Sequence, residues 1–558
     1  MKKLLVVVVL FMAVTATTRA QDDDSFKPYM TNPGYEEGDW ISTSMTRWVR
    51  NLAIGLEHVY FSTTGGISRY NYYTNRWEYS WTTSNGLADN DVLLVAYDGT
   101  TNYVWCATQR GVSCYFPTFK RWENYYPIEI GVSDDDRIIS IGFNDDYVWL
   151  ESKRGKIVRG SKYGRIFQNI SHDPLNNTDI IWYGNRSANW DRLPFFTMGD
   201  GYFFSADGYI SDINLNRYDI TSWTLDKWGT YWVTTFGLGV GTARARIDHL
   251  ELLPNGLFVD HVSAFEIDHK KNEVWLGTLA AISDESGVSR WNLDDENWDY
   301  FQAKFISSFN NDMVTSIALD DDRVYFATEY GIAIYYPPAD EWTHLDRFEN
   351  LADNYIYDVE VDSDYVWAGT SYGLSRITKR TIDTDSIEIK TVMPRALRQV
   401  QIYDVEIMDN LIWLGSEYGV YIYDNFTDDG GFQAEAGGPM NEPIYTISVS
   451  DNQVWTGSDR SIEVYDYDEK KWLGGPERLL TEGDIVNYIE AGDQIVWVAT
   501  DHGVLKYDRQ RKLWVRYTMD DGLIDNNVTS VKSDGDYVWF GTLSGLTKFY
   551  WNNPIRID

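Results

Sequence analysis

The chain has 558 residues and a formal net charge of −36. That length exceeds one ordinary domain, and a hydrophobic content of 43% is typical of a globular protein and not of a disordered one. The negative charge makes nucleic acid and anionic membrane surfaces poor partners, because phosphate binding needs clustered Lys and Arg. Aromatic residues are abundant, with 24 Trp and 40 Tyr, and this favours β-structure.

The N-terminus has the pattern of an export signal. Lys2 and Lys3 precede a short apolar run over residues 4–14, and small residues follow as far as Ala20. We therefore predict a signal peptide over residues 1–20, an acidic linker over 21–39, and a periplasmic or secreted mature protein. The alternative is an uncleaved anchor, although the run is short for a membrane span. No later stretch is long and apolar enough to predict membrane insertion.

Only two cysteines occur, Cys106 and Cys114, on either side of a predicted hairpin turn. They could form a disulfide, or both could be buried small apolar residues. Two cysteines cannot form a disulfide framework or a metal quartet.

A short pattern of the type Val-Trp-x-Gly-Thr recurs along the chain. Trp455, Trp497 and Trp539 are spaced by 42 residues each time. The clear copies lie at 274–278, 324–328, 366–370, 412–416, 454–458, 496–500 and 538–542, and looser copies lie at 59–63, 104–108, 148–152, 202–205 and 231–235. These positions define about twelve units, and a Trp that recurs at one position of each unit is expected to pack between sheets.

Each unit contains four short strand signals separated by turn residues, as in 513–517, 528–531, 538–542 and 546–549. Four strands in about 42 residues match one blade of a β-propeller. We therefore predict an all-β propeller of about twelve four-stranded blades. Rings usually have four to eight blades, so two rings of about six are favoured over one large ring.

The two chain ends complement each other. The last unit has second and third strands only, whereas residues 40–48 and 49–54 supply an outer and an inner strand. Pairing of the termini in one blade would remove exposed sheet edges. The simplest division is a first propeller over 40–310 and a second over 311–558, with closure by both termini, and insertion of one propeller within the other is the alternative.

The segment from Tyr517 to Val528, Tyr-Thr-Met-Asp-Asp-Gly-Leu-Ile-Asp-Asn-Asn-Val, resembles the two-component regulator propeller repeat. Similar strings stand at 85–90 and 350–354, and the resemblance covers about residues 40–550, weakening between about 150 and 250. In that family the repeats form periplasmic sensor domains of hybrid histidine kinases, and they also occur in exported proteins, including secretion-system components. The kinase portions are not expected here, because the chain ends at Asp558.

Two sets of loops are candidate sites, because both are expected on the face of a propeller that commonly holds ligands. The first set is the short turn after each Gly-Thr position, which carries Tyr, Arg or His suited to stacking on sugars or holding carboxylates. Its residues are Tyr330, Tyr372, Tyr418, Arg460, His502, Arg110 and Arg154. The alternative is that each Tyr packs on the neighbouring blade as a repeat residue.

The second set contains Asp and Asn: Asp89, Asn90, Asp353, Asn354, Asp525 and Asn526. Ca²⁺ could bind there through oxygen ligands, but recurrence in every clear unit favours turn formation. We expect no other cofactor and no dedicated metal site. Specificity is expected where the repeat is broken, at Arg398, Gln399 and Gln401 and at the insertion over 279–286.

Catalytic motifs are not apparent. The seven His are scattered, without the spacing of a metalloprotease or a nucleophile elbow. The leading hypothesis is therefore an exported, non-enzymatic binding or scaffolding propeller that recognises a glycan, peptide or partner protein. Two alternatives are a polysaccharide lyase or glycosidase with its site at a propeller mouth, and a structural component of a secretion or cell-surface complex. No catalytic residue can be named.

Overall fold

The computed structural model describes residues 35–36, 38–554 and 556, apart from 165, 172–173, 175–178, 188–192, 206, 279–286, 304–305, 307–308, 310–312, 385, 393–396, 398, 434–437, 440–441, 451, 460 and 475–483. The regular secondary structure of the described chain is almost entirely antiparallel β-sheet, which confirms the all-β prediction, and the sheets form the blades of a multi-blade β-propeller. The expected signal peptide, most of the linker, the insertion over 279–286, Arg398 and Arg460 lie outside the described residues. No helix among the described residues is long and apolar enough to cross a membrane.

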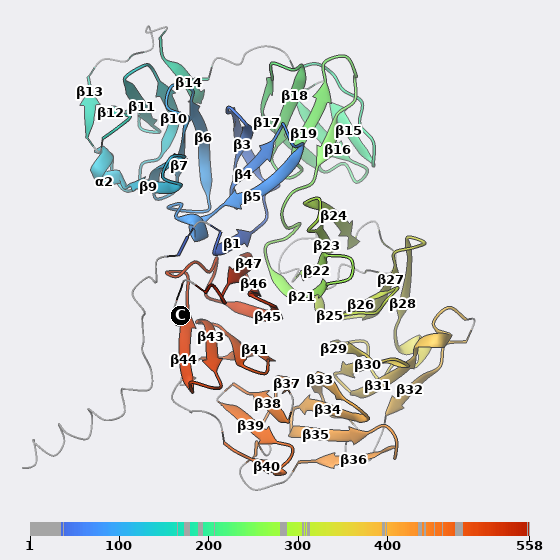
Figure 1. Cartoon of the computed structure of the whole chain (residues 1–558). Helices are drawn as coiled ribbons and strands as arrows, with labels where there is room; N and C mark the ends of the chain where they lie inside the picture. The colour runs from blue at the N-terminus through green and yellow to red at the C-terminus, as the bar shows by residue number, and fades with distance from the viewer. Residues whose placement is uncertain are drawn as a thin grey trace, which may run out of the picture.

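Seven four-stranded sheets follow one another around a ring, shown face-on in the lower half of Figure 1. Their strands are β21 Val262–Asp268, β22 Glu273–Thr278, β23 Gly287–Asn292, β24 Asn297–Gln302, β25 Val314–Leu319, β26 Val324–Thr328, β27 Gly331–Tyr336, β28 Glu341–Leu345, β29 Ile356–Val361, β30 Tyr365–Thr370, β31 Gly373–Thr378, β32 Ile389–Val392, β33 Ile402–Met408, β34 Leu411–Ser416, β35 Gly419–Asp424, β36 Asp429–Phe432, β37 Thr446–Ser450, β38 Gln453–Gly457, β39 Ile462–Asp466, β40 Lys471–Trp472, β41 Val486–Ala491, β42 Ile495–Thr500, β43 Gly503–Asp508, β44 Leu513–Tyr517, β45 Val528–Asp534, β46 Tyr537–Thr542, β47 Gly545–Tyr550 and β1 Trp40–Thr43.

The remaining strands form a second group of sheets, which we call the first unit. They are β2 Val49–Ile54, β3 His58–Thr63, β4 Gly66–Asn71, β5 Arg76–Trp81, β6 Val92–Asp98, β7 Tyr103–Thr108, β8 Gly111–Phe116, β9 Arg121–Tyr125, β10 Ile138–Phe143, β11 Tyr147–Ser152, β12 Ile157–Ser161, β13 Phe167–Ile170, β14 Ile181–Gly184, β15 Tyr202–Ser205, β16 Tyr209–Asp212, β17 Arg217–Leu225, β18 Thr230–Thr235, β19 Gly239–Arg244 and β20 Glu251–Leu253. The helical turns are α2 Pro127–Ile130 and the 3₁₀ turns η1 Thr83–Asn85, η4 Arg347–Glu349 and η5 Lys379–Thr381.

The Gly-Thr repeat closes the turn between the second and third strands of a blade. Thr500 donates its hydroxyl proton to the carbonyl of Gly503 at 2.8 Å, and the same hydroxyl accepts the backbone N–H of His502 at 3.1 Å. Gly503 has a φ of +110°, and a Cβ there would lie 2.3 Å from the carbonyl oxygen of Tyr517. The turn therefore needs glycine both for its dihedral angle and for the close approach of the fourth strand.

The last blade of the ring is completed by the N-terminal strand. β1 pairs antiparallel with β47, with Trp40 opposite Phe549. Their rings stack at 3.8 Å, and Trp40 is 2% exposed. A Cβ on Gly545 would meet the carbonyl oxygen of Thr43 at 2.5 Å, so β1 occupies the place that the fourth strand holds in other blades. β1 therefore covers the edge of β47 that would otherwise be unpaired and gives this blade its fourth strand.

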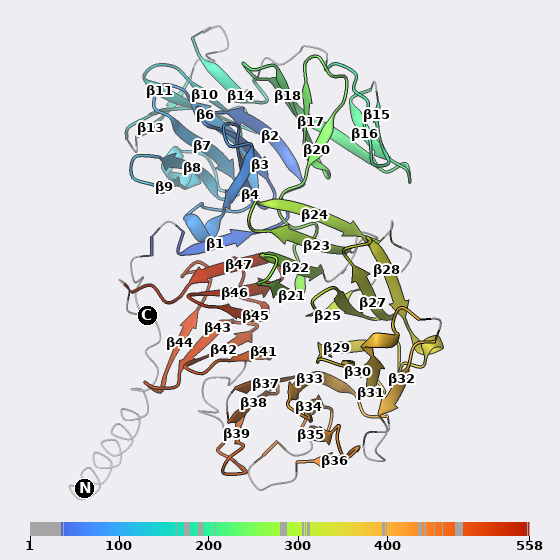
Figure 2. The same cartoon turned by 45° about the vertical axis from the view of Figure 1, so that its right-hand side comes forward.

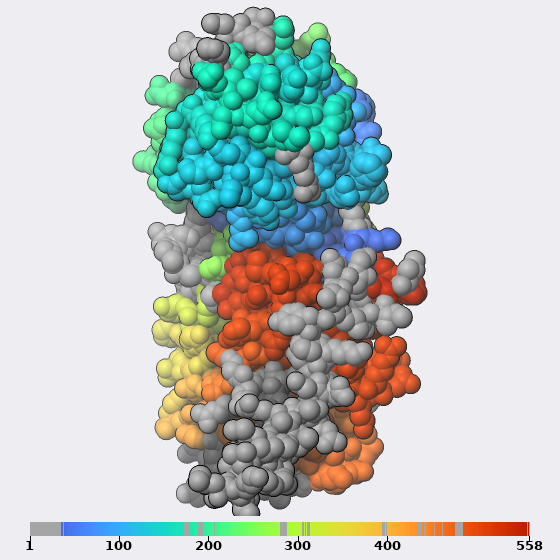
Figure 3. Space-filling model, turned by 90° about the vertical axis from the view of Figure 1, so that its left-hand side faces the viewer, coloured from blue at the N-terminus to red at the C-terminus, as the bar shows by residue number. Residues whose placement is uncertain are grey.

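The first unit is inserted between β1 and β21. Because β21 contacts both β25 and β45, the sheet of β21–β24 belongs to the seven-bladed ring. The simplest division, with a boundary at residue 310, is therefore wrong: that ring consists of residues 40–43 and 262–550. Figure 2 shows the first unit beside β1, β23 and β24, and Figure 3 shows its cyan and blue residues above the red C-terminal residues.

The number of blades in each group of sheets differs from the predicted two rings of about six blades. The ring has seven sheets and the first unit has four. The difference arises where the repeat weakens: β14 joins the sheet of β10–β13 as a fifth strand, and β15 and β16 extend the sheet of β17–β20 to six strands. The repeat copies at 202–205 and 231–235 consequently share one sheet.

The recurrent Trp residues pack between neighbouring sheets. Trp275, for example, contacts Phe326 and Tyr335 of the next blade and is 1% exposed. The two cysteines are free and buried. Cys114 pairs with Trp105 across β7 and β8, whereas Cys106 pairs with Ser113, so the two thiols face opposite sides of one sheet and cannot form a disulfide without rearrangement.

Candidate functional site

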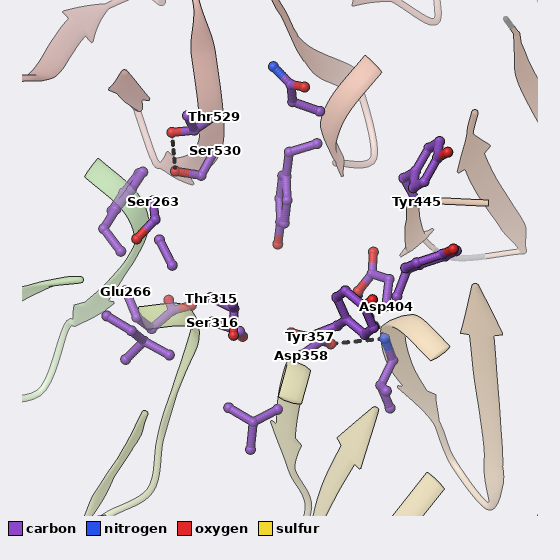
Figure 4. Close-up of a pocket in the computed structure, with 18 of the residues that line it drawn as sticks. Ser263, Glu266, Thr315, Ser316, Tyr357, Asp358, Asp404, Tyr445, Thr529 and Ser530 are labelled. Atoms are coloured by element: carbon purple, nitrogen blue, oxygen red, sulfur yellow. Dashed lines mark hydrogen bonds between the residues drawn. The ribbon is translucent and has the colours of Figure 1, made fainter. Parts of the chain in front are cut away.

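The centre of the seven-bladed ring contains a cavity of about 590 Å³, lined by the innermost strand of each blade (Figure 4). The second residue of each innermost segment lines it, and we call these seven residues the first layer: Ser263, Thr315, Tyr357, Tyr403, Tyr445, Asn487 and Thr529. Beyond the first layer, the cavity is lined by Asp358, Asp404, Glu266, Glu360, Glu406 and Lys532, among others.

Four members of the first layer tie neighbouring blades together. Each donates a side-chain hydrogen bond to the backbone carbonyl of the first residue in the next blade's innermost strand. Thr315 donates to Ile356 at 2.7 Å, and Thr529 donates to Val262 at 2.6 Å. Asn487 and Ser263 make the equivalent bonds to Val528 and Val314. A small polar residue at this position is therefore a structural part of the repeat.

The other three members are Tyr357, Tyr403 and Tyr445, which we call the tyrosine arc. Their ring centroids are 5.1 Å apart from Tyr357 to Tyr403 and 5.1 Å from Tyr403 to Tyr445. The hydroxyls of Tyr357 and Tyr403 both donate to Oε1 of Gln401, at 3.2 and 2.9 Å. No inter-blade bond of the Thr315 type is made by the arc among the described residues, so three successive blades replace a structural hydrogen bond with an aromatic wall.

Two carboxyl groups lie next to the arc and belong to the same strands, β29 and β33. Asp358 accepts the backbone N–H of Val405 at 2.9 Å, and Asp404 accepts that of Ile447 at 2.6 Å. The two carboxyl groups also hydrogen-bond to each other. Burial raises the pKa of both, and the neighbouring Asp358 charge raises that of Asp404 further.

Carboxylates dominate the deeper lining. Burial raises the pKa of Glu360 to about 7, and the pKa of Glu406 lies well above its usual range for the same reason. Lys532 is the one cation among the described lining residues, and its ammonium lies 2.7 Å from Glu266. Five carboxyl groups thus share one ammonium group within the lining. The cavity is walled by tyrosine on one side and is acidic in character.

The first unit contains a cavity of opposite character. Its volume is about 1010 Å³, and its charged lining residues are Arg50, Arg137 and Lys153. Arg50 contacts Asp91 and donates to the carbonyl of Val92 at 3.0 Å, while Arg137 donates to Gln109 at 2.7 Å. The two guanidinium groups are thus already engaged by the protein.

The predicted tyrosines lie outside the cavity lining. Tyr330, Tyr372 and Tyr418 stand on the turns that follow β26, β30 and β34 and are 53%, 46% and 51% exposed. The adjacent Glu417 raises the pKa of Tyr403, although less than burial does, which places this turn near the arc. The prediction therefore selected turns close to the cavity, whereas most residues that line it belong to the innermost strands, and Leu543 is the lining residue that stands on such a turn.

The structure does not bring the remaining predicted residues to the cavity. His502 lies beside Asp501 at 2.8 Å and Asp484 at 3.4 Å, a trio that could offer three ligand atoms to a metal, but Arg516 also contacts Asp484. Arg110 and Arg154 stand in the first unit, exposed, and contact Asp89 and Asp135. Arg460 lies outside the described residues.

The Asp and Asn loops have structural roles. Asn90, Asn354 and Asn526 each accept a backbone N–H seven residues earlier in the chain, at 2.7, 2.9 and 2.8 Å. Asp353 accepts the hydroxyl of Ser371 at 2.9 Å, and Asp525 accepts that of Ser544. These contacts agree with the interpretation of the loops as turns.

Sequence reasoning missed the arc, although a signal existed. Residues 356–360 and 402–406 share the string Ile-Tyr-Asp-Val-Glu, in which a small polar residue is replaced by Tyr and is followed by two acids. Gln401, one of the residues expected to break the repeat, does contact the arc. Gln399 has a φ of +65°, and Arg398 is outside the described residues.

No protein-family model and no curated protein sequence matches the chain. The structure of PorZ, described as an essential bacterial surface component of the type-IX secretion system of Porphyromonas gingivalis, is similar over 92% of this chain and 87% of its own, with 14% identity and a TM-score of 0.57. The extracellular domain of a putative hybrid two component system from B. thetaiotaomicron matches over 90% of this chain and 69% of its own, with 16% identity and a TM-score of 0.43. At these identities the similarity to PorZ shows a shared fold, and membership of the two-component regulator propeller repeat family stays a prediction.

Proposed function

We propose that this chain is an exported, non-enzymatic binding module that takes a glycan, peptide or partner group into the cavity of the seven-bladed ring. One observation carries the proposal: the tyrosine arc replaces the side chains that tie blades together elsewhere in the first layer. A position that gives up a structural bond in three neighbouring blades, and presents a row of neighbouring aromatic rings to a cavity, is suited to ligand contact.

A binding role is favoured over glycoside hydrolysis by the geometry of the acid pair. Glycosidases hold their two carboxyl groups about 5–5.5 Å apart, or about 6.5–9.5 Å apart when a water must fit between them. Asp358 and Asp404 hydrogen-bond to each other, which is closer than either arrangement. The pair is therefore suited to accepting hydrogen bonds from a ligand and not to flanking a glycosidic bond.

A role in a cell-surface complex is a second candidate. It is favoured by the similarity in fold to PorZ, which extends over most of both chains. Size-exclusion of native envelope extracts separates this role from binding of a free ligand, because a structural component would elute in a stable high-mass complex.

The test uses a variant in which the arc is returned to the repeat's own residue, Tyr357→Thr/Tyr403→Thr/Tyr445→Thr. Threonine already stands at this position in β25 and β45, so the variant is expected to fold. Wild type and variant are applied to a glycan array and to envelope extract for co-purification. We expect partners of the wild type to be lost by the variant, whereas equal capture by both would contradict the proposed site.

A further inference from the structure

The cavity of the seven-bladed ring has two chemically different walls. Figure 4 shows Asp404 and Tyr445 on one side, while Ser263, Glu266, Thr529 and Ser530 line the other. Tyr357 and Asp358 adjoin Asp404, and Thr315 and Ser316 lie beside Asp358, to which Ser316 hydrogen-bonds. Tyr355 extends the aromatic side, with its ring centroid 4.7 Å from that of Tyr357. The side with the tyrosine arc thus combines aromatic faces with carboxyl oxygens.

The carboxyl oxygens of this wall are held in place by the backbone. Val405 and Ile447 donate their N–H groups to Asp358 and Asp404, respectively. These bonds fix the orientation of both side chains before any ligand arrives, so little ordering is needed on binding. Asp358 is also hydrogen-bonded by Ser316, and Asp404 also accepts the backbone N–H of Val405, so both carboxyl groups are held by several partners.

The cavity holds more carboxyl groups than the one cation among its described lining residues can pair. Glu266, Glu360 and Glu406 lie deeper than the Asp pair, and Lys532 forms its ion pair with Glu266. The charge of Lys532 also favours ionisation of Glu360 and Glu406, but burial outweighs it for both. Another positive charge would therefore be attracted to the centre of this ring.

We infer that the ligand of this cavity carries an alkylammonium group, which enters between the tyrosine arc and the Asp358–Asp404 pair. This inference rests on the proposed binding function and specifies its ligand class. The ammonium group has three donors, which suits two carboxyl groups, and a cation near tyrosine faces is stabilised by their quadrupoles. Anionic ligands are disfavoured by the same lining.

Binding of the cation is coupled to the protons of the cavity. Besides the tyrosine arc and Tyr355, the titratable groups that line the cavity are Asp358, Asp404, Glu360, Glu406, Glu266, Tyr488 and Lys532, and Glu490 lies close to Lys532. An added positive charge favours the ionised form of the carboxyl groups, so protons are released when the ligand binds. Affinity should accordingly rise with pH between about 5 and 8 and should fall as salt is raised.

The test is calorimetric titration of the full mature chain with 1,4-diaminobutane, 1,4-butanediol and succinate, which match in length and differ in charge. Two buffers of different ionisation enthalpy reveal proton release. We expect the diamine to bind at least tenfold more tightly than the diol, with proton release, and succinate not to bind. Equal binding of diamine and diol would overturn the inference. A second titration uses a lysyl dipeptide in place of the diamine. Tighter binding of the dipeptide identifies a peptide side chain as the source of the ammonium group, and tighter binding of the diamine identifies a free amine.

Two variants test which side chains of the cavity bind the diamine. Asp358→Asn/Asp404→Asn removes the charge, and Tyr403→Leu keeps apolar bulk but removes the aromatic face. We expect at least tenfold weaker diamine binding in the first and about threefold weaker binding in the second. Circular dichroism confirms folding of both, and unchanged affinity in both folded variants would contradict the inference.

Failure of this inference is separable from failure of the proposed function. If the threonine arc variant loses the envelope partner but neither the diamine nor the lysyl dipeptide competes for that partner, the site stands and the ligand class is wrong. If the threonine arc variant keeps the partner, the site itself is wrong.

Discussion

The two central cavities of this chain are built from the same repeat and have opposite charge. The seven-bladed ring is lined by five carboxyl groups and Lys532, whereas the charged lining of the first unit is Arg50, Arg137 and Lys153. Arg50 holds the same position in β2 that Thr315 holds in β25, and it also donates to the first residue of the next blade's innermost strand. The second residue of an innermost strand can therefore both tie neighbouring blades together and set the charge of the cavity. The class of ligand can thus change while the fold stays the same.

The two groups of sheets also differ in how they are completed, because the N-terminal strand β1 completes the last blade of the seven-bladed ring. Trp40→Ala should have the largest effect, because it removes a 2% exposed indole stacked on Phe549. We expect a loss of about 3–5 kcal/mol in the stability of the ring. Hydrogen exchange of β45 and β47 measures it, with Trp77→Ala in the first unit as the matched control. Unchanged protection of β45 and β47 in Trp40→Ala would contradict closure by β1.

Lys532→Met tests whether the ammonium group of Lys532 stabilises the fold around the acidic cavity. The variant leaves Glu266 without its partner at 2.7 Å. Both side chains are 23% exposed, so we expect a loss of about 2 kcal/mol and not the full cost for a buried pair. Denaturant unfolding measures the effect, and it should be larger at pH 8 than at pH 5. Lys153→Met is the control from the basic cavity. An equal loss of stability in both variants would show that Lys532 has no special role in the acidic cavity.

Glu360→Gln should stabilise the protein in a pH-dependent way. The pKa of Glu360 is raised by burial from 4.5 to about 7 in the folded chain. The stability it contributes is full below pH 4.5 and is lost as pH rises through 7, because the unfolded chain releases this proton first. The variant avoids that loss, so we expect a gain of about 1–2 kcal/mol at pH 8 and almost none at pH 4, after allowance for partial solvent access. A gain that is independent of pH would show that Glu360 is ionised in the folded state.

The smallest effect concerns the thiols of the first unit, which report on its unfolding. Burial raises the pKa of Cys106 to about 12, and Cys114 is also fully buried. We expect neither to react with a thiol reagent in the native protein, and both to react when the first unit opens. With four sheets, and without a chain end completing any of them among the described residues, the first unit should expose its thiols at lower denaturant than β45 and β47 lose their hydrogen-exchange protection. Simultaneous transitions would indicate one cooperative unit.

Local patterns predicted the blades well. The spacing of Trp455, Trp497 and Trp539 and the glycine turns, such as that at Gly503, describe contacts within a unit, and they reappear as strands and hairpins. The boundary was not predictable in this way, because the position of β21 depends on its contact with β45, far away in the sequence.

The site was predicted only in part. The turn residue Tyr418 was selected for its chemistry and lies near the arc, but alternation along an innermost strand cannot show which side chains converge on the axis of a ring. Tyr357 and Tyr403 are 46 residues apart in the sequence, and only closure of the ring brings their rings within 5.1 Å of each other.

Ligand binding in the acidic cavity is tested most directly by comparing two triple variants against one captured partner. One is the threonine arc variant, and the other changes the exposed turn residues, Tyr330→Thr/Tyr372→Thr/Tyr418→Thr. Both remove three tyrosines from neighbouring blades of the same ring, so they differ in position and not in composition. We predict that the arc variant loses at least tenfold in affinity while the turn variant stays within threefold of wild type. The reverse order would place binding on the turns and contradict a site within the cavity.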